Sequence, residues 1–125
     1  MNLLLDTHIF LWFLADSRRL SAGARGQIQR ADTVFVSAAS VWEAALKTAL
    51  GKLDVSADDL VAGIVGSGFS ELPVRARHAI RVSALPALHR DPFDRLLVAQ
   101  AIDEQLRLLT ADAMLAPYGE VVSVV

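Results

Sequence analysis

The stretch Asn2-Leu3-Leu4-Leu5-Asp6 is the most informative part of this sequence for the class of fold. Its leucines are consecutive and lack the three- and four-residue spacing of a helix with one apolar face. A short apolar run of this kind is typical of a strand that is buried on both faces of a parallel sheet. We therefore expect a strand over residues 2–5 that ends at a carboxylate.

The rest of the chain alternates between similar apolar runs and helix signals. Further strands are expected at residues 34–36, 69–74, 108–110 and 121–125, and helices at residues 9–14, 21–30, 40–50, 75–84 and 92–105. Another helix is expected to open at Ser56, and a helical turn after Ala111. Strands alternating with helices predict an α/β fold, in which a mostly parallel sheet of about five strands is covered on both sides.

Length and composition exclude several classes of protein. A chain of 125 residues predicts a single domain over residues 1–125, and 54% hydrophobic residues with a net charge of −2 exclude disorder. There is no cysteine, which excludes a disulfide scaffold and a thiolate zinc site and suits a cytoplasmic protein. Asp16 interrupts the run Ile9–Ala15 after seven residues, so no membrane span is expected. The mean hydropathy of +0.42 favours apolar surface that a partner or a second copy of the chain would cover.

Four acidic residues lie where a predicted strand passes into a helix. Asp6 ends the first strand, and Glu43 lies one turn into the helix after the second. Asp94 falls in the first turn of a long helix, and Asp112 follows the fourth strand. In a parallel sheet these transitions share one edge, beyond the carboxyl ends of the strands, where ligands bind. We therefore expect the four carboxylates to meet.

Carboxylates gathered in one place stay ionised only if positive charge neutralises them, and Mg²⁺ or Mn²⁺ suits oxygen ligands. Zinc fits less well, because the three histidines lack ligand spacing and there is no thiolate. A metal held by carboxylates activates water and stabilises charge on a phosphoryl oxygen. The cluster therefore favours hydrolysis of phosphodiester bonds. Its metal ligands and catalytic residues would be Asp6, Glu43, Asp94 and Asp112.

Each acid taken alone also has a structural explanation. Ser40 and Glu43 match a capping box, and Glu43 could instead pair with Lys47 one turn later. Asp94 could complement the dipole of its helix. Asp6 is the hardest to explain in this way, because a carboxylate directly after a fully apolar strand is costly unless it is paired. The joint pattern therefore carries more weight than any one acid.

Other side chains near the proposed edge are open to two interpretations. Asp91 precedes a proline and is expected to cap its helix, and Asp112 could cap the turn that follows it. Thr7 and Ser37 could orient water or carboxylates, although capping explains the serine equally well.

Basic and aromatic residues add further candidates. Lys47 and Arg95 lie beside the acids and could contact phosphates. His8 could contact a substrate, but a partly buried structural histidine is the favoured interpretation. Trp12 and Trp42 could stack on bases, but both are expected to pack in the core.

The same residues fall into four segments with a family resemblance. The segments are Leu3-Leu4-Leu5-Asp6-Thr7-His8, Val36-Ser37-Ala38-Ala39-Ser40-Val41-Trp42-Glu43, Asp91-Pro92-Phe93-Asp94-Arg95-Leu96-Leu97-Val98-Ala99-Gln100-Ala101 and Leu109-Thr110-Ala111-Asp112. They resemble the successive motifs of PIN-domain ribonucleases, and more narrowly those of the VapC toxins of bacterial toxin–antitoxin pairs. Any one segment alone is weak evidence for the family, but the four segments in this order are specific to it. The resemblance extends over essentially the whole chain.

The resemblance implies a three-layer α/β/α fold and an endoribonuclease that depends on Mg²⁺ or Mn²⁺. It also implies a homodimer that a small VapB-like antitoxin protein inhibits. The four acids of the family correspond to Asp6, Glu43, Asp94 and Asp112, and in similar proteins the first and third are the firmest metal ligands. Asp91 would lie just outside the ligands, and Ser37 would orient water or a ligand.

Two other classes of function stay open. An apolar strand that ends in Asp6 also suits phosphoryl transfer through an aspartyl phosphate, or a receiver-like domain. Those chemistries usually need a lysine at a late strand end, whereas the last lysine here is Lys52. The other possibility is a binding module without catalysis. The sequence pI of about 5.8 is an argument against RNA as a substrate, because proteins that bind nucleic acids often carry a basic face.

Overall fold

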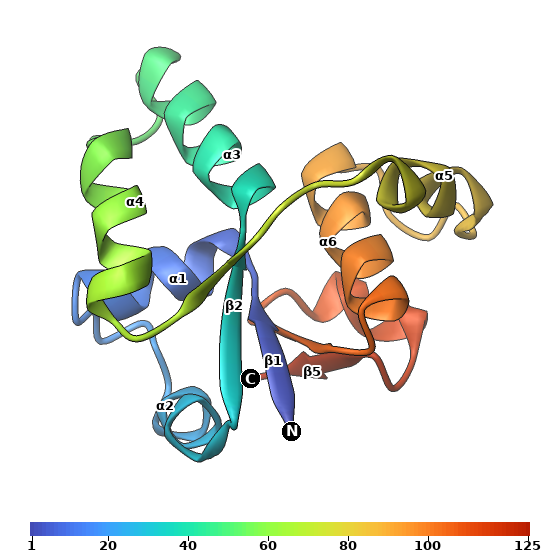
Figure 1. Ribbon diagram of the computed structural model, residues 1–125, viewed down its shortest axis with the longest axis horizontal. Helices are drawn as coiled ribbons and strands as arrows, with labels where there is room; N and C mark the ends of the chain where they lie inside the picture. The colour runs from blue at the N-terminus through green and yellow to red at the C-terminus, as the bar shows by residue number, and fades with distance from the viewer.

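The computed structural model describes residues 1–125 as a five-stranded sheet between two layers of helices (Figure 1). All neighbouring strands are parallel, in the order β3-β2-β1-β4-β5. The strands are β1 (Asn2–Leu5), β2 (Thr33–Ser37), β3 (Ser70–Leu72), β4 (Arg107–Thr110) and β5 (Val122–Val124). This arrangement confirms the predicted α/β fold and its parallel sheet.

The helices follow the predicted order along the chain. They are α1 (Thr7–Leu14), α2 (Ala22–Arg30), α3 (Ala38–Ala49), α4 (Ala57–Gly66), α5 (Ala76–Ala84), α6 (Pro92–Asp103) and the 3-10 helix η1 (Ala113–Tyr118). Ser21, Ser56 and Asp91 cap α2, α4 and α6 through their side chains, as expected from the sequence. Gly51 follows α3 with a φ of +75°, which glycine adopts without strain. None of the helices combines the length and apolar character needed to cross a lipid bilayer.

The consecutive leucines of β1 supply both faces of the sheet. Because successive side chains of a strand point to opposite faces, Leu3 and Leu5 pack on one side and Leu4 on the other. The first side is covered by α1, α2, α3 and α4, and the second by α6 and η1. In Figure 1, α1, α3 and α4 lie to the left of the strands and α5 and α6 to the right. The molecule therefore has the three layers that the resemblance implied.

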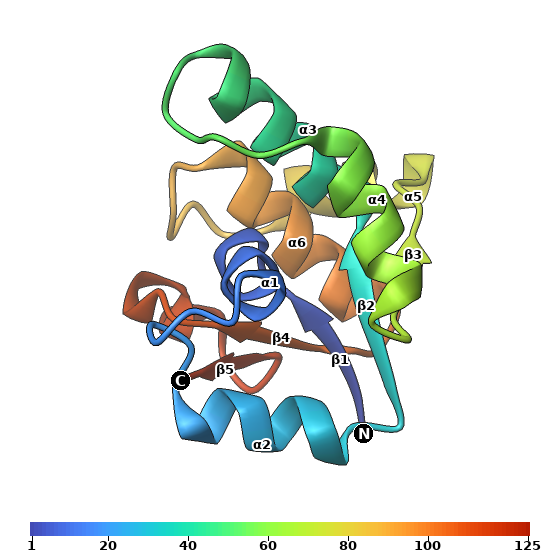
Figure 2. The same cartoon turned by 90° about the vertical axis from the view of Figure 1, so that its left-hand side faces the viewer.

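The sheet has a point where the chain changes its direction of growth. From β1 the chain adds β2 and β3 on one side, and afterwards β4 and β5 on the other. Leu5 of β1 aligns with Val36 of β2 and with Leu109 of β4, so these strands end at nearly the same level. Figure 2 shows α2 near the start of β2 and α3 continuing from its end. In open parallel sheets the crevice at such a switch point, beyond the carboxyl ends of the strands, is the usual ligand site.

The start of α3 differs from the prediction. Ser37 caps the helix by accepting a hydrogen bond of 3.0 Å from the N–H of Ala39, whereas the capping box was placed at Ser40 and Glu43. Ser37 is the last residue of β2, still paired with β3, so its extended backbone gives it the cap. The capping box is therefore wrong, and Glu43 is free for other contacts.

Trp42 also differs from the prediction of core packing, because 62% of its surface is exposed. Glu43 occupies the buried side of α3, so the preceding residue points outward, where Trp42 meets the ring of Phe93 edge-on at 4.9 Å between centroids. Trp12 is partly buried and packs against the core on the α1 side, as expected.

Candidate metal centre

Asp6 ends β1 and caps α1. Its backbone is extended (φ −72°, ψ 168°), and its Oδ1 accepts a hydrogen bond of 2.9 Å from the N–H of Ile9. Its Oδ2 accepts a hydrogen bond from the hydroxyl of Thr110 at the end of β4. The residue is 6% exposed, and this burial raises the pKa of the carboxyl, against the opposing effect of the two hydrogen bonds. Asp6 is thus held in one orientation at the switch point.

Glu43 is the second acid, and a buried set of polar contacts holds it. The hydroxyl of Thr7 donates to Glu43 Oε1 over 2.6 Å, and Thr7 Oγ1 also lies 3.0 Å from Ser40 Oγ. Lys47, on the next turn of α3, places its Nζ 2.7 Å from Glu43 Oε2. Because Thr7 follows Asp6 directly, these contacts tie α3 to the first acid.

Asp94 lies in the first turn of α6, at a position fixed by Asp91. Asp91 Oδ1 accepts hydrogen bonds from the N–H groups of Phe93 (2.8 Å) and Asp94 (3.1 Å). The pKa of Asp94 is raised to about 7, first because burial disfavours its charged form and then because Asp91, Asp6 and Glu43 repel it. The charges of Asp6, at the end of β1, and Glu43, on α3, therefore both act on Asp94 at the start of α6.

Asp112 follows β4 and joins the same group through a histidine. Its Oδ1 caps η1 by accepting a hydrogen bond of 2.9 Å from the N–H of Met114, and its Oδ2 lies 3.3 Å from His89 Nε2. Asp94 Oδ2 lies 3.7 Å from the same nitrogen. One ligand atom each from His89, Asp94 and Asp112 fall within 4.8 Å of one another. The structure thus brings the last two predicted acids together.

His89 is a member of this group that sequence reasoning missed. Its Nδ1 accepts a hydrogen bond of 3.1 Å from the N–H of Asp91. The neutral ring therefore carries its hydrogen on Nε2, facing Asp94 and Asp112. Spacing along the chain was a poor guide to this histidine, because the loop before α6 folds it back over the strand ends. Its place two residues before a helix cap was the only signal in the sequence.

Two other predicted residues have different surroundings. Ser37 is buried and uses its hydroxyl to cap α3, so its predicted role in orienting water or a ligand has no contact with the acids to support it. His8 is exposed, with its ring centroid 6.1 Å from that of Trp12, so the interpretation as a partly buried structural histidine was wrong.

The two predicted phosphate contacts also differ from each other. Arg95 donates to the carbonyl oxygens of Val82 (3.1 Å) and His89 (3.4 Å), which braces the loop before α6. Lys47 remains at the acids, bonded to Glu43. Of the two residues, only Lys47 forms an ion pair with one of the four predicted acids.

The donor atoms of this group suit a hard divalent cation. Asp94 and Asp112 offer carboxylate oxygens, and the charge of Asp6 acts on Asp94 from the end of β1; Mg²⁺ and Mn²⁺ favour such oxygen-rich sets. Asp94 is 21% exposed at its side chain and forms no ion pair with a lysine or arginine. A buried carboxylate without a cation is costly, and a bound ion would offset that cost. The residues present therefore fit the predicted metal.

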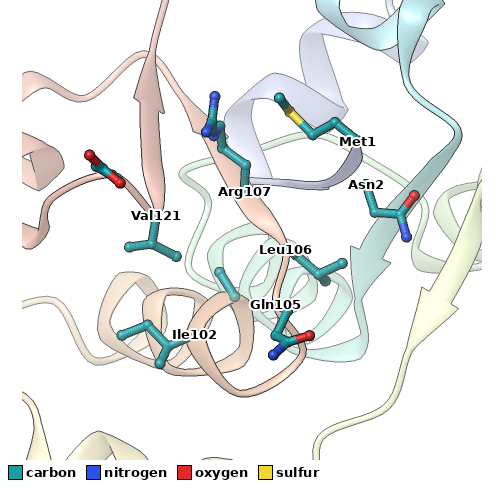
Figure 3. Close-up of a pocket in the computed structure, with 9 residues that line it drawn as sticks. Met1, Asn2, Ile102, Gln105, Leu106, Arg107 and Val121 are labelled. Atoms are coloured by element: carbon teal, nitrogen blue, oxygen red, sulfur yellow. The ribbon is translucent and has the colours of Figure 1, made fainter.

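A separate hollow of about 460 Å³ lies at the other end of the sheet, where β1 and β4 begin (Figure 3). Its lining residues are Met1, Asn2, Ala101, Ile102, Gln105, Leu106, Arg107, Glu120 and Val121. Glu120 is the only acid among them, so this hollow lacks the ligands for a metal centre.

A second group of His78, Asp103 and Glu104 joins α5 to the end of α6. His78 Nε2 lies 3.3 Å from Glu104 and 3.6 Å from Asp103. Arg77 pairs with both carboxylates, and its hydrogen bonds are the main reason that their pKa values are lowered. This group is neutralised by its own arginine, and we assign no metal to it.

The fold of this chain is shared with solved structures, among them the following three. VapBC2 from Rickettsia felis, bound to a DNA fragment from its promoter, has a TM-score of 0.70 at 15% identity and covers 100% of this chain and 98% of its own. A toxin–antitoxin complex from Klebsiella pneumoniae has a TM-score of 0.68 at 18% identity, with coverage of 97% and 95%. FitAcB from Neisseria gonorrhoeae has a TM-score of 0.66 at 16% identity, with coverage of 98% and 96%. At these identities the likeness concerns the fold alone.

Sequence comparison goes further than the fold. Ribonuclease VapC22 from Mycobacterium tuberculosis (strain ATCC 25618 / H37Rv) is 31% identical over 125 aligned positions, which span 91% of this chain and 89% of that protein. The sequence model of the PIN domain matches residues 3–120. The resemblance expected from the four motifs is confirmed: the chain belongs to the PIN domain family.

Proposed function

We propose that this chain is a metal-dependent endoribonuclease that acts as the toxin of a toxin–antitoxin pair. The observation that carries the proposal is the half-buried carboxylate of Asp94, which other acids repel and which forms no ion pair with a lysine or arginine. The likeness to a VapC ribonuclease supplies the substrate class, RNA. The absence of cysteine suits activity in the cytoplasm.

Each acid has a distinct part in the proposed chemistry. Asp6, Asp94 and Asp112 would hold the ion, which when bound lowers the pKa of water and offsets negative charge on the phosphoryl oxygens. Asp91 sets the start of α6 and so the direction of Asp94. His89 keeps Asp112 turned toward Asp94 through its Nε2. Glu43 holds Thr7, the neighbour of Asp6, in place. We propose Mg²⁺ as the natural ion, with Mn²⁺ able to replace it.

An antitoxin has a plausible seat beside these acids. A hollow of about 680 Å³ between α1 and α4 is lined mainly by apolar side chains, and His8, which is two residues from Asp6, lies at its edge. A VapB-like antitoxin would place an apolar helix in this groove and an arginine among the carboxylates, where it would mimic the charge of the metal. The structural relatives from R. felis and K. pneumoniae are complexes of this general kind.

A homodimer would cover a second apolar surface. This apolar surface surrounds a hollow of about 390 Å³ between α3, α5 and α6. Its lining residues are Trp42, Leu46, Ala79, Val82, Pro92, Phe93 and Leu96. Trp42 and Leu46 are exposed to 62% and 40% in the single chain, and burying such a patch favours association.

RNA cleavage tests the proposed activity directly. We expect the purified chain to cut total RNA with Mg²⁺, to stop when a chelator is added, and to resume when Mg²⁺ is restored in excess. Mapping of the new RNA ends would give the cleavage site. Cleavage that continues in the chelator, or that is absent with both Mg²⁺ and Mn²⁺ in a folded protein, would overturn the proposal.

The antitoxin needs its own test. Expression with the protein encoded next to this chain should give a complex on gel filtration that no longer cuts RNA. A chain that stays uncomplexed and fully active beside that neighbour would refute the pairing and leave the nuclease proposal intact.

A further inference from the structure

Glu43 and Lys47 form the one lysine–carboxylate ion pair inside the acid cluster. Only 3% of the Glu43 side chain and 29% of the Lys47 side chain are exposed, and the two charged atoms are 2.7 Å apart. The other oxygen of Glu43 accepts the hydroxyl of Thr7 over 2.6 Å. Both oxygens of this carboxylate are therefore occupied by groups of the protein itself.

The opposite side of the cluster is different. The imidazole of His89 lies 3.7 Å from Asp94 and 3.3 Å from Asp112, and the other oxygen of Asp112 caps η1. Side-chain exposures of 21% for Asp94 and 40% for Asp112 leave this side more open to solvent than the Glu43 side. The carboxylate of Asp94 accepts no hydrogen bond, so an ion arriving from solution finds its free oxygens on one side and an ammonium group on the other.

Lys47 also acts on acids beyond its own partner. The negative charges of Glu43, Asp91 and Asp94 all act on its ammonium group, which lies 2.7 Å from Glu43 Oε2. A dication placed next to it would meet strong repulsion at short distance. The ammonium group therefore disfavours a second ion at Glu43.

We propose that Lys47 is a positioning residue that takes the place of a second cation, so that the centre binds a single divalent ion on the side of Asp94 and Asp112. Glu43 then serves as the anchor of Thr7 and Lys47 and is not a metal ligand. This inference rests on the proposed metal-dependent nuclease and sets the number of ions it uses. It also replaces the expectation that Lys47 is free to contact phosphate.

Counting bound Mn²⁺ tests the inference without any RNA. Titration of the full chain, followed by the electron paramagnetic resonance signal of free Mn²⁺ at pH 8, should give one ion per chain. Lys47→Met removes the charge but keeps an apolar stem of similar length, and should raise the count to two. Lys47→Arg should return it to one. Lys52→Met, a change of the same kind at an exposed site, should leave it at one.

A double variant identifies the residue that takes the second ion. If Glu43 becomes a ligand once Lys47 is gone, the combination Lys47→Met with Glu43→Gln should bring the count back to one. Circular dichroism checks the fold of each variant. Should Lys47→Met fail to fold, Lys47→Gln keeps a hydrogen-bond donor to Glu43 without the charge and should also bind two ions.

Each outcome of the count decides the matter. Two ions in the unaltered chain, or one ion in both uncharged variants, would overturn the role of Lys47 and leave a metal-dependent nuclease in place. A chain that binds no Mn²⁺ would contradict the proposed function itself. An unchanged ion count in Lys47→Met with a raised KM for RNA would instead make Lys47 a phosphate contact.

Discussion

Asp94 is the residue whose charge state depends most on its surroundings. Its pKa is raised to about 7, whereas an aspartate in an unfolded chain titrates near 3.8. Between these values the folded protein keeps a proton that the unfolded chain releases. Without metal, the free energy of unfolding should therefore fall as the pH rises from about 4 to about 7, and level off above that.

Replacing Asp94 with asparagine removes this titration. In chelator, we expect Asp94→Asn to be more stable than the unaltered chain by at most about 4 kcal/mol at pH 8, and by a smaller margin of at most about 1.6 kcal/mol at pH 5. Urea denaturation at the two pH values measures the difference. The same gain at both pH values would show that ionisation of Asp94 is not the cause. The exposed Asp58→Asn provides a matched control and should change neither value.

Asp6 is the acid on which the proposed chemistry depends most directly. Asp6→Asn should abolish Mg²⁺-dependent RNA cleavage, because the amide carries no charge for the ion. The fold should persist, because the amide oxygen can still accept from Ile9 and the Thr110 hydroxyl can reverse its hydrogen bond. Cleavage assays with circular dichroism check both statements. Full activity in this variant would contradict the mechanism.

At the scale of single residues, sequence could predict at which end of the sheet the acids lie but not what holds them. Asp6 and Asp112 follow strands, Asp94 lies in the first turn of α6 and Glu43 lies more than a turn into α3, and a parallel sheet fixes where such positions lie. The pairing of Glu43 with Lys47 was one of two contacts open to it, and the structure confirms it. The contact of Glu43 with Thr7 depends on how α1 packs against α3, and the local sequence does not predict that packing.

At the scale of elements, the start of α6 shows how a cap positions a functional group. Asp91 accepts hydrogen bonds from two N–H groups, one of them that of Asp94. We expect Asp91→Asn to keep the cap and most of the cleavage activity, because asparagine caps helices about as well as aspartate. Asp91→Ala should lose about 1 kcal/mol of stability and reduce cleavage further. Urea denaturation and RNA cleavage rates measure both, and equal losses in the two variants would refute the capping role.

The two helices that carry acids were predictable to different degrees. The dipeptide Asp91-Pro92 predicts a single starting point for α6, and the helix begins there in the structure. For α3 the sequence offers both Ser37 and Ser40, and only the pairing of β2 with β3 through Ser37 decides between them. A helix start that depends on a neighbouring strand cannot be predicted from local sequence alone.

At the scale of the whole molecule, the parallel sheet and its two covering layers followed from the alternation of elements. The surface did not. Trp42 was expected in the core because apolar residues flank it, but Glu43 takes the buried position on that turn of α3. An exposed tryptophan that packs against Phe93 indicates a surface where another chain binds.

This surface gives a prediction about assembly. If a second copy covers it, Trp42→Glu should turn the dimer into a monomer, because a buried charge without a partner is costly. Light scattering during gel filtration measures the mass. Val65→Glu, at an exposed apolar position on α4 outside this surface, should keep the dimer. A dimer that survives Trp42→Glu would place the contact elsewhere.

The central position of β1 has a consequence for synthesis of the chain. On the ribosome, β1 can pair with β2 early, but its other edge stays open until β4 has been translated. Thr110, which holds Asp6 from that edge, lies 104 positions further along the chain. In the nascent chain, Asp6 is therefore made long before Thr110, which holds it, and before Asp94 and Asp112, with which it would bind the metal. An enzyme of this design acquires the means to cut RNA only after the ribosome has translated its fourth strand.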